Sequence, residues 1–280
     1  MSRNKLNMGV LFVASIILLF HSPSINSTAF ELETAANGEI PFSYIEATGR
    51  GPSKWGELDP KWRACGDGRL QSPIDIVDVN VHVFPKLGEL QRDYKPANAT
   101  IMGRGRDIIV QWKGDAGNIN INGTIYSLQH CHWLTPSEHT FNGTRYDLEL
   151  HIVHANLLGQ ITVVGILYQY GKPDSFLSKL LPFIKSVTKQ EKDLGIINPR
   201  KIVFGSRKYY RYNGSLSVPP CTEGVLWTVI KKVRTVSVEQ LQALKDAVDD
   251  GFEMNARPIQ PFYGRSLYLY NPCEIIGNFA

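Results

Sequence analysis

The sequence predicts a mostly β protein (α+β) that folds as a single domain around one large antiparallel or mixed sheet. Two observations support this. Short apolar runs separated by Gly, Pro, Asn and Asp recur along the chain, which is typical of strands joined by turns. From about residue 35 onward the sequence contains no low-complexity linker, internal repeat or shift in composition. A chain of 280 residues that is rich in β structure is therefore consistent with one domain.

Six segments are expected to form strands, since β-branched, aromatic and aliphatic residues are concentrated in them. They are residues 107–112, 118–128, 147–154, 161–168, 224–230 and 267–270. Two helices are expected at the periphery. One follows the capping box Ser237-Val238-Glu239-Gln240, and the other covers the apolar stripe between Phe176 and Ile184.

Residues 1–28 are interpreted as a secretory signal peptide. Arg3 and Lys5 precede an apolar run from Met8 to Phe20, and small or polar residues follow up to Ala29. This run is too short to span a bilayer comfortably, although a retained anchor is the alternative. No later segment is long and apolar enough to cross a membrane, so the sequence predicts no membrane contact after signal removal.

The composition adds two expectations. Lys and Arg total 30 against 26 Asp and Glu, a mild excess of +4, and the basic residues are scattered. The one arginine cluster, residues 103–106, is interpreted as an ordinary loop, so nucleic acid is not expected as a partner. Secretion also predicts glycosylation at the sequons of Asn98, Asn122, Asn142 and Asn213. The four cysteines, Cys65, Cys131, Cys221 and Cys273, allow three full disulfide pairings.

The spacing of the histidines indicates a chemical function. Five of the seven lie between positions 130 and 154. Alternate residues share a face of a strand, so His130, His132 and Leu134 are expected to point the same way. Asn142-Gly143 is a good hairpin-turn dipeptide, and pairing the two flanking strands would bring His132 and His151 together, with Glu149 behind His151. This arrangement fits a metal site with a supporting carboxylate, but packed strand histidines remain the alternative.

Six short stretches give the chain a family resemblance. They are residues 71–76 (QSPIDI), 131–133 (CHW), 136–140 (PSEHT), 149–154 (ELHIVH), 214–221 (GSLSVPPC) and 255–258 (NARP). With these, the sequence resembles the alpha-type carbonic anhydrases, particularly the secreted plant form, from about residue 42 to 270. The resemblance implies a carbonic anhydrase domain over residues 35–275. It also implies one central, mostly antiparallel twisted sheet of about ten strands.

The resemblance also implies a chemistry and a set of residues. Family members bind Zn²⁺ through three histidines, and the metal lowers the pKa of bound water to about 7, so that hydroxide attacks carbon dioxide and yields bicarbonate. His132 and His151 match two ligands, Glu149 and Asn255 match residues that support the site, and Glu138 with Ser217 matches the pair that orients the hydroxide. The apolar wall against which carbon dioxide sits in the family is matched by Val153, Val163, Leu216, Val225 and Trp227. Val218 matches a further substrate-binding position. Cys65 and Cys221 match the family disulfide, which leaves Cys131 and Cys273 unpaired.

The first departure from the family pattern concerns the metal. Leu134 stands where the pattern His-Trp-His places the second zinc ligand, and leucine has no lone pair to offer. Losing even the hydrogen-bond partner of a ligand typically costs about 10–100-fold in affinity or activity, so losing a ligand is expected to cost at least as much. His130 replaces a glutamine that orients the first ligand. A displaced site of His130, His132 and His151 is therefore a less favoured alternative.

The next departure concerns proton transfer. Arg106 stands at the position where fast members carry a proton-shuttling histidine, and arginine does not titrate in proteins. Two functions follow from the sequence. One is reversible hydration of carbon dioxide, impaired at the metal. The other is a non-catalytic binding or storage role on the same fold, which related plant proteins serve. The expected location is the secretory pathway, leading to the cell wall or to a plastid.

Overall fold

The computed structural model describes residues 41–272. The predicted signal peptide and Cys273 lie outside the described residues. The strands are β1 (Asp75–Ile76), β2 (Val81–Val83), β3 (Gln91–Tyr94), β4 (Ala97–Gly103), β5 (Ile108–Trp112), β6 (Gly117–Ile121), β7 (Thr124–Leu134), β8 (Thr140–Phe141), β9 (Thr144–Arg145), β10 (Leu148–Ala155), β11 (Ile161–Tyr170), β12 (Lys192–Ile197), β13 (Tyr209–Ser215), β14 (Glu223–Ile230), β15 (Arg234–Val236) and β16 (Leu267–Tyr270).

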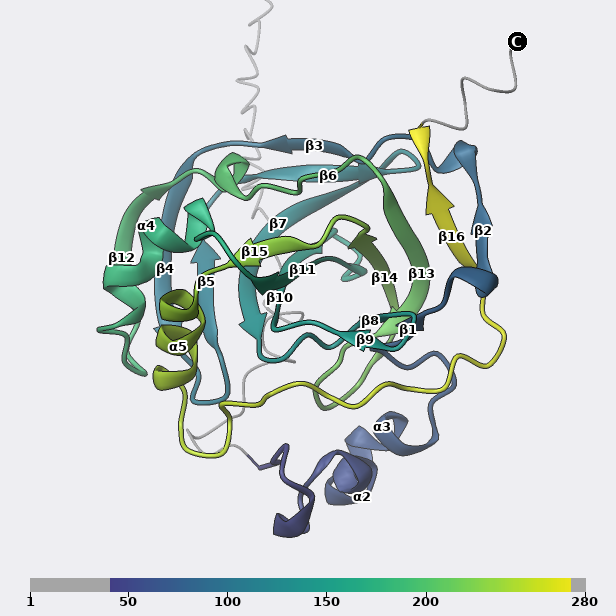
Figure 1. Ribbon diagram of the computed structural model, residues 1–280, viewed down its shortest axis with the longest axis horizontal. Coiled ribbons are helices and arrows are strands. Elements are labelled where there is room, and N and C mark those ends of the chain that lie inside the picture. Colours follow the sequence, from purple (N-terminus) through teal and green to yellow (C-terminus); the bar gives the residue numbers. More distant parts are fainter. Residues whose placement is uncertain (1–40, 273–280) are drawn as a thin grey trace, which may run out of the picture.

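One large twisted sheet dominates the molecule (Figure 1). Its continuous order is β12-β4-β5-β7-β10-β11-β14-β13-β16-β2, with β15, β3 and β6 added at the sides. The pairs β11–β14, β11–β15 and β16–β2 are parallel, and the other pairs of this sheet are antiparallel. A separate small sheet has the order β1-β8-β9. The expected central, mostly antiparallel sheet of about ten strands is confirmed.

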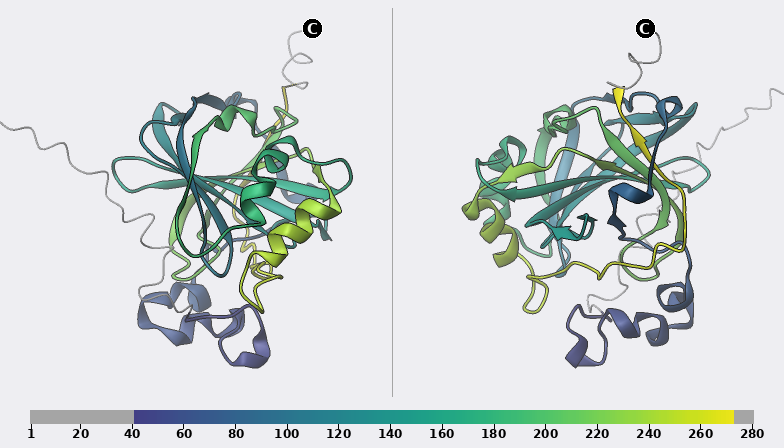
Figure 2. Two further views of the ribbon diagram at one scale, coloured as in Figure 1. Left: turned by 90° about the vertical axis from the view of Figure 1, so that its left-hand side faces the viewer. Right: turned by 45° about the vertical axis from the view of Figure 1, so that its right-hand side comes forward.

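The helices are short and lie at the edges (Figure 2). They are α2 (Trp55–Leu58), α3 (Ala64–Asp67), α4 (Ser175–Ile184) and α5 (Val238–Asp246). Asp174 caps α4 through the backbone N–H groups of Phe176 and Leu177, and Ser237 forms the predicted capping box with Gln240. Six single-turn 3-10 helices complete the described elements, at residues 46–48, 52–54, 60–62, 78–80, 85–87 and 199–201. No helix within residues 41–272 is both long and apolar enough to cross a membrane.

Two predicted elements differ from the structure. Residues 118–128 were expected to form one strand, but β6 ends at Ile121 and β7 begins at Thr124. The intervening Asn122 and Gly123 adopt φ angles of 52° and 85°, the left-handed region that a tight hairpin turn requires. The Asn142-Gly143 turn is real but joins β8 to β9, whereas β7 pairs with β10 directly.

The large sheet is buried on both faces around β10. All eight of its residues are buried. Leu148, Leu150 and Ile152 pack into the larger apolar cluster, which also receives the apolar stripes of α4 and α5. On the opposite face, Val153 joins a second cluster with Trp227 and its neighbours. This alternation places Glu149 and His151 on the second face, where the site is built.

Candidate active site

Strands β7 and β10 bring the two predicted ligands together. His151 pairs with His132 in the antiparallel register. Their ring centroids are 5.2 Å apart with the planes at 85°, and both side chains are buried. The expected strand pairing is therefore confirmed. The position two residues beyond His132 is occupied by Leu134, which is 2% exposed and pairs with Glu149.

The residues present do not fit the three-histidine zinc site of the resemblance. His132 and His151 supply two imidazoles, and the Leu134 side chain is an alkyl group with no donor atom. His130 lies on the same face as His132, and the two rings stack with centroids 5.4 Å apart. Within residues 41–272, however, one group of three possible ligands converges to within 4.8 Å, and it consists of His139, Glu149 and His151.

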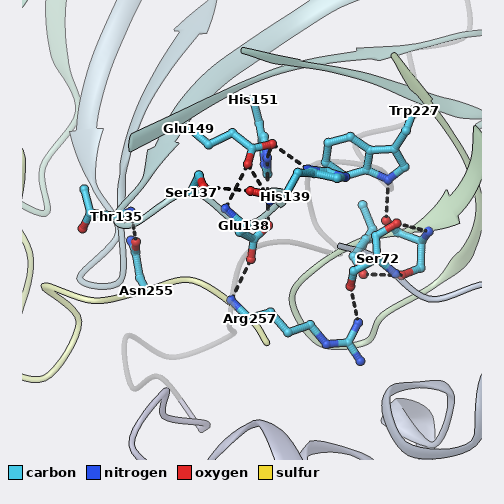
Figure 3. Close-up of polar contacts among 12 residues, drawn as sticks. Ser72, Thr135, Ser137, Glu138, His139, Glu149, His151, Trp227, Asn255 and Arg257 are labelled. Atoms are coloured by element: carbon cyan, nitrogen blue, oxygen red, sulfur yellow. Dashed lines mark hydrogen bonds and ion pairs between the residues drawn. The ribbon is translucent and has the colours of Figure 1, made fainter. Parts of the chain in front are cut away.

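The Glu149 carboxylate organises that group (Figure 3). Its Oε1 lies 2.7 Å from His139 Nδ1 and 2.9 Å from His151 Nε2. Its Oε2 accepts the backbone N–H groups of Glu138 and His139 at 2.9 and 2.8 Å. Burial alone would raise the pKa of Glu149, but these two histidines outweigh it and hold the pKa well below its usual value. The cluster is thus a hydrogen-bonded support behind His151.

His139 is a site residue that sequence reasoning missed. Its Nε2 lies 2.6 Å from the Tyr212 hydroxyl, and that hydroxyl lies 2.9 Å from the Ser72 Oγ atom. A buried chain of polar groups therefore runs from Glu149 across the sheet to Ser72. The signal in the sequence is the histidine of the stretch Ser137-Glu138-His139-Thr140, which lies ten residues before Glu149 and twelve before His151.

Glu138 is the second buried carboxylate. Its Oε1 accepts the backbone N–H of Arg257 at 2.9 Å. Burial raises the pKa of Glu138, and the charge of His151 and the hydroxyl of Ser217 oppose this rise. The predicted proximity of Glu138 and Ser217 is consistent with this interaction. Arg257, which is 1% exposed, anchors the same corner through Gln71 Oε1, the Ser72 carbonyl and the Cys65 carbonyl.

A pocket opens in front of the two histidines. Its empty volume, the open mouth included, is about 320 Å³. One wall is apolar, and the predicted carbon dioxide wall lies there with one exception: Val225 is buried in the neighbouring apolar cluster rather than among the lining residues. The lining residues are Arg104, Arg106, Asp107, His132, His151, Val153, Val163, Leu216, Ser217, Val218 and Trp227.

The arginine cluster is not an ordinary surface loop, and that expectation is wrong. The side chains of Arg104 and Arg106 are each 5% exposed, and that of Asp107 is 3% exposed. Arg104 binds Asp107 in a two-pronged pair, Nε to Oδ1 at 2.7 Å and Nη2 to Oδ2 at 2.6 Å. Burial opposes ionisation, but the charges of Arg104, Arg106 and His132 lower the pKa of Asp107 to about 2. The arginines face inward because this carboxylate compensates them.

Asn255 fixes that loop in place. Its Nδ2 donates to the Arg106 carbonyl at 2.6 Å, and its Oδ1 accepts the Thr135 N–H at 2.7 Å. The amide therefore joins the loop after β4 to the end of β7. Asn255 is a positioning residue for Arg106 and for the segment that leads to Glu138.

The predicted disulfide joins Cys65 to Cys221, and Cys131 is a buried free thiol. Both bonded cysteines belong to an apolar cluster with Phe42, Trp55 and Val218. The cross-link therefore attaches the N-terminal helices to the loop that carries Ser217. It joins residues 156 positions apart in the sequence.

Comparisons with known proteins agree with this fold and site. The model of the eukaryotic-type carbonic anhydrases matches residues 50–271, and the chain belongs to that family. Alpha carbonic anhydrase 4 of Arabidopsis thaliana is 50% identical over 263 residues, covering 94% of this chain and 97% of that protein. Dioscorin DB3L of Dioscorea polystachya is 44% identical, covering 90% of this chain and 94% of that protein.

Two solved structures are similar as well. A crystal structure of dioscorin complexed with ascorbate superimposes with a TM-score of 0.81 at 42% identity, covering 83% of this chain and 98% of that one. The alpha-carbonic anhydrase of Thermovibrio ammonificans, in complex with sulfanilamide, gives 0.74 at 34% identity, covering 81% and 98%. The chain thus resembles both carbonic anhydrases and dioscorins along most of its length.

The first prediction concerns the space for Glu149. Gly165 pairs with His151, and a Cβ atom there would lie 2.9 Å from Glu149 Oε1. Gly165→Ala is expected to displace the carboxylate and lower the free energy of unfolding by about 1–3 kcal/mol. Urea unfolding followed by circular dichroism measures this. Gly66→Ala is the control, since its Cβ would lie 3.7 Å from the nearest atom. Equal stability of the two variants would contradict the prediction.

The second prediction concerns Asp107. Asp107→Asn leaves two buried guanidiniums without their carboxylate and is expected to cost about 3–5 kcal/mol in the free energy of unfolding. Asp67→Asn is the control, because its pair with Arg63 is exposed and worth about 1 kcal/mol or less.

The effect of Asp107 depends on pH. The pKa of this group is about 2 in the folded state, against about 3.9 for an unfolded aspartate. Its stabilising contribution is therefore present above pH ~4 and is lost as the pH falls toward about 2. The difference between the wild type and Asp107→Asn is expected to shrink over that interval. A constant difference would argue against this pairing.

Proposed function

We propose that the pocket binds carbon dioxide and bicarbonate, and that their interconversion is impaired because Leu134 occupies the position of a zinc ligand. The observation that carries the proposal is the strand register. His132 and His151 face each other across β7 and β10, while the next inward position of β7 holds a buried leucine. The apolar residues that match the family's substrate site thus lie beside an incomplete set of zinc ligands.

The residues that match the family favour carbon dioxide chemistry over a different reaction. The apolar residues Val163, Leu216 and Trp227 suit a small, neutral, linear molecule such as carbon dioxide. Ser217 lines the pocket together with the two histidines, and its hydroxyl interacts with the buried Glu138. Zinc, when bound in this family, supplies an activated water. With two imidazoles, we expect weak metal occupancy and therefore slow hydration.

Proton transfer is expected to be slow as well. Arg106 lines the pocket at the position of the shuttling histidine and is held by the Asn255 contact to its carbonyl. A guanidinium keeps its proton at neutral pH, so it cannot carry protons to bulk water. Both departures reduce turnover without removing the substrate pocket.

A binding role without catalysis is the second candidate function. The similarity to dioscorins supports it, because one of them has been solved in complex with ascorbate. In this second function, the pocket would hold a small molecule without converting it.

Entry into the secretory pathway is part of the proposal. The signal-like segment precedes a domain with a disulfide, which persists in oxidising compartments. The four sequon asparagines 98, 122, 142 and 213 are all exposed. Asn142 differs from the others because its amide exchanges two hydrogen bonds with Asp78, through the Asp78 N–H and Oδ2. We therefore expect lower glycan occupancy at Asn142.

Restoring the ligand tests the proposed function. Leu134→His is expected to raise bound zinc toward one ion per chain and to raise zinc affinity at least about 10–100-fold. Zinc content after purification, zinc affinity in a metal buffer and carbon dioxide hydration by stopped flow measure this. Leu134→Ala removes the alkyl group without adding a donor. Ile196→His adds an imidazole on an exposed strand position. Neither control is expected to raise the zinc content or the zinc affinity above that of the wild type.

The wild type separates the two candidates. Slow hydration that increases with added zinc supports an impaired carbonic anhydrase. Absence of hydration at saturating zinc supports the binding role. One tightly bound zinc in the wild type, with hydration equal to that of Leu134→His, would overturn the proposed impairment.

A further inference from the structure

Arg211 is a buried cation on the face of the large sheet that points away from the pocket. It lies on β13 between Tyr210 and Tyr212, which belong to the apolar cluster beside the pocket, so alternation turns Arg211 to the opposite face. The residue is 5% exposed. In the adjacent strands β14 and β16 it pairs with Thr228 and Tyr268. This position is therefore separate from the two histidines of the candidate active site.

The guanidinium of Arg211 has no negative partner in the part of the chain that the structure describes. Its Nε donates to the Thr228 hydroxyl at 3.0 Å, and its central carbon lies 5.0 Å from the centroid of the Tyr209 ring. Burial lowers the pKa of Arg211, and the groups that oppose this shift are Tyr209 and Tyr126, with no carboxylate among them. A buried charge without a partner is costly. The position therefore favours a negative charge supplied from outside the chain.

The polar groups next to this charge are hydrogen-bond donors. The two Nη atoms of Arg211 carry four N–H groups, and none of them has an acceptor within residues 41–272. The Thr228 oxygen accepts from Arg211 Nε, so its own O–H can donate elsewhere. Tyr126 is 8% exposed, and its hydroxyl forms no hydrogen bond with the described residues. A group of donors without an acceptor is suited to an anion, which can accept from all of them.

The surroundings favour a monoatomic anion. Tyr126, Tyr209 and the nearby Ile230 belong to the larger apolar cluster, so they offer few polar contacts to a larger ligand. A water molecule could accept the same hydrogen bonds, but it would leave the charge of Arg211 uncompensated. A chloride ion is little larger than a water molecule, accepts several hydrogen bonds and supplies the missing negative charge.

We propose that Arg211, Thr228 and Tyr126 form an internal binding site for a halide ion such as chloride. The ion accepts hydrogen bonds from the Nη groups and the two hydroxyls, and it compensates the buried charge. The site uses neither the histidines nor the lining residues of the pocket, so it stands or falls separately from the proposed carbon dioxide chemistry. Because the ion binds the folded chain and not the unfolded one, chloride is expected to stabilise the fold.

Thermal unfolding at varied chloride concentration tests the site. Sodium gluconate replaces sodium chloride at constant ionic strength, because gluconate is too large for a site that holds one atom. The unfolding midpoint of the wild type is expected to rise with the logarithm of the chloride concentration, with the slope of one ion per chain. Arg211→Met is expected to lose this dependence. Arg207→Met is the matched control, since it removes the same charge from a side chain that is 66% exposed. Equal chloride dependence in Arg211→Met and the wild type would overturn the proposal.

Two further measurements locate the ion, and they remain decisive if Arg211→Met fails to fold. Tyr126→Phe removes one hydroxyl donor and is expected to weaken chloride binding about tenfold. Tyr263→Phe is its control, because Tyr263 is 56% exposed, and its chloride affinity is expected to be unchanged. A crystal grown in bromide is expected to show one anomalous peak within hydrogen-bonding distance of the Arg211 Nη atoms. An ordered water alone at that place would refute the site, and so would bromide binding at crystal concentration only, without any effect of chloride on stability.

Discussion

The buried Glu149 carboxylate is the interaction on which the site depends. A charge in a buried environment is costly unless it is fully hydrogen bonded, and Glu149 obtains four partners from three residues. Two are backbone N–H groups of residues 138 and 139, and two are imidazoles. The same carboxylate thereby orients His151, anchors the segment after β7 and begins the polar chain to Tyr212. Gly165 on the neighbouring strand leaves room for it.

This hydrogen-bond network explains how the surrounding residues can keep their arrangement although one zinc ligand is missing. Both oxygens of Glu149 are bound by protein groups, so this carboxylate needs no metal ion to offset its burial. Leu134 itself is well suited to its position as a fully packed apolar side chain, whose burial contributes about 1.5–3 kcal/mol. An imidazole there would need a partner for its ring nitrogens. At position 134, folding stability therefore favours leucine, whereas metal affinity favours histidine.

The sequence could predict the parts of the structure that depend on local pattern. Strand alternation placed His132 and His151 on one face, and the capping box at Ser237 marked the start of α5. The Asn122-Gly123 dipeptide carries the same hairpin signal as Asn142-Gly143, but the apolar alternation on both sides of it favours one continuous strand. The placement of the loop that carries Arg106 could not be predicted, because the Arg106 carbonyl is held by Asn255, 149 positions further along the chain. Contacts of that separation leave no trace in a local pattern.

The charges around the two histidines are held by groups of the protein itself. Asp107 binds Arg104 and lies beside Arg106, and Glu149 binds both His139 and His151. In a buried environment such pairs are poorly screened, so each carboxylate has a larger effect than it would have at the surface. The affinity for a divalent cation beside His132 and His151 is therefore limited by the donor atoms rather than by the charges, because position 134 supplies an alkyl group where a third imidazole would be needed.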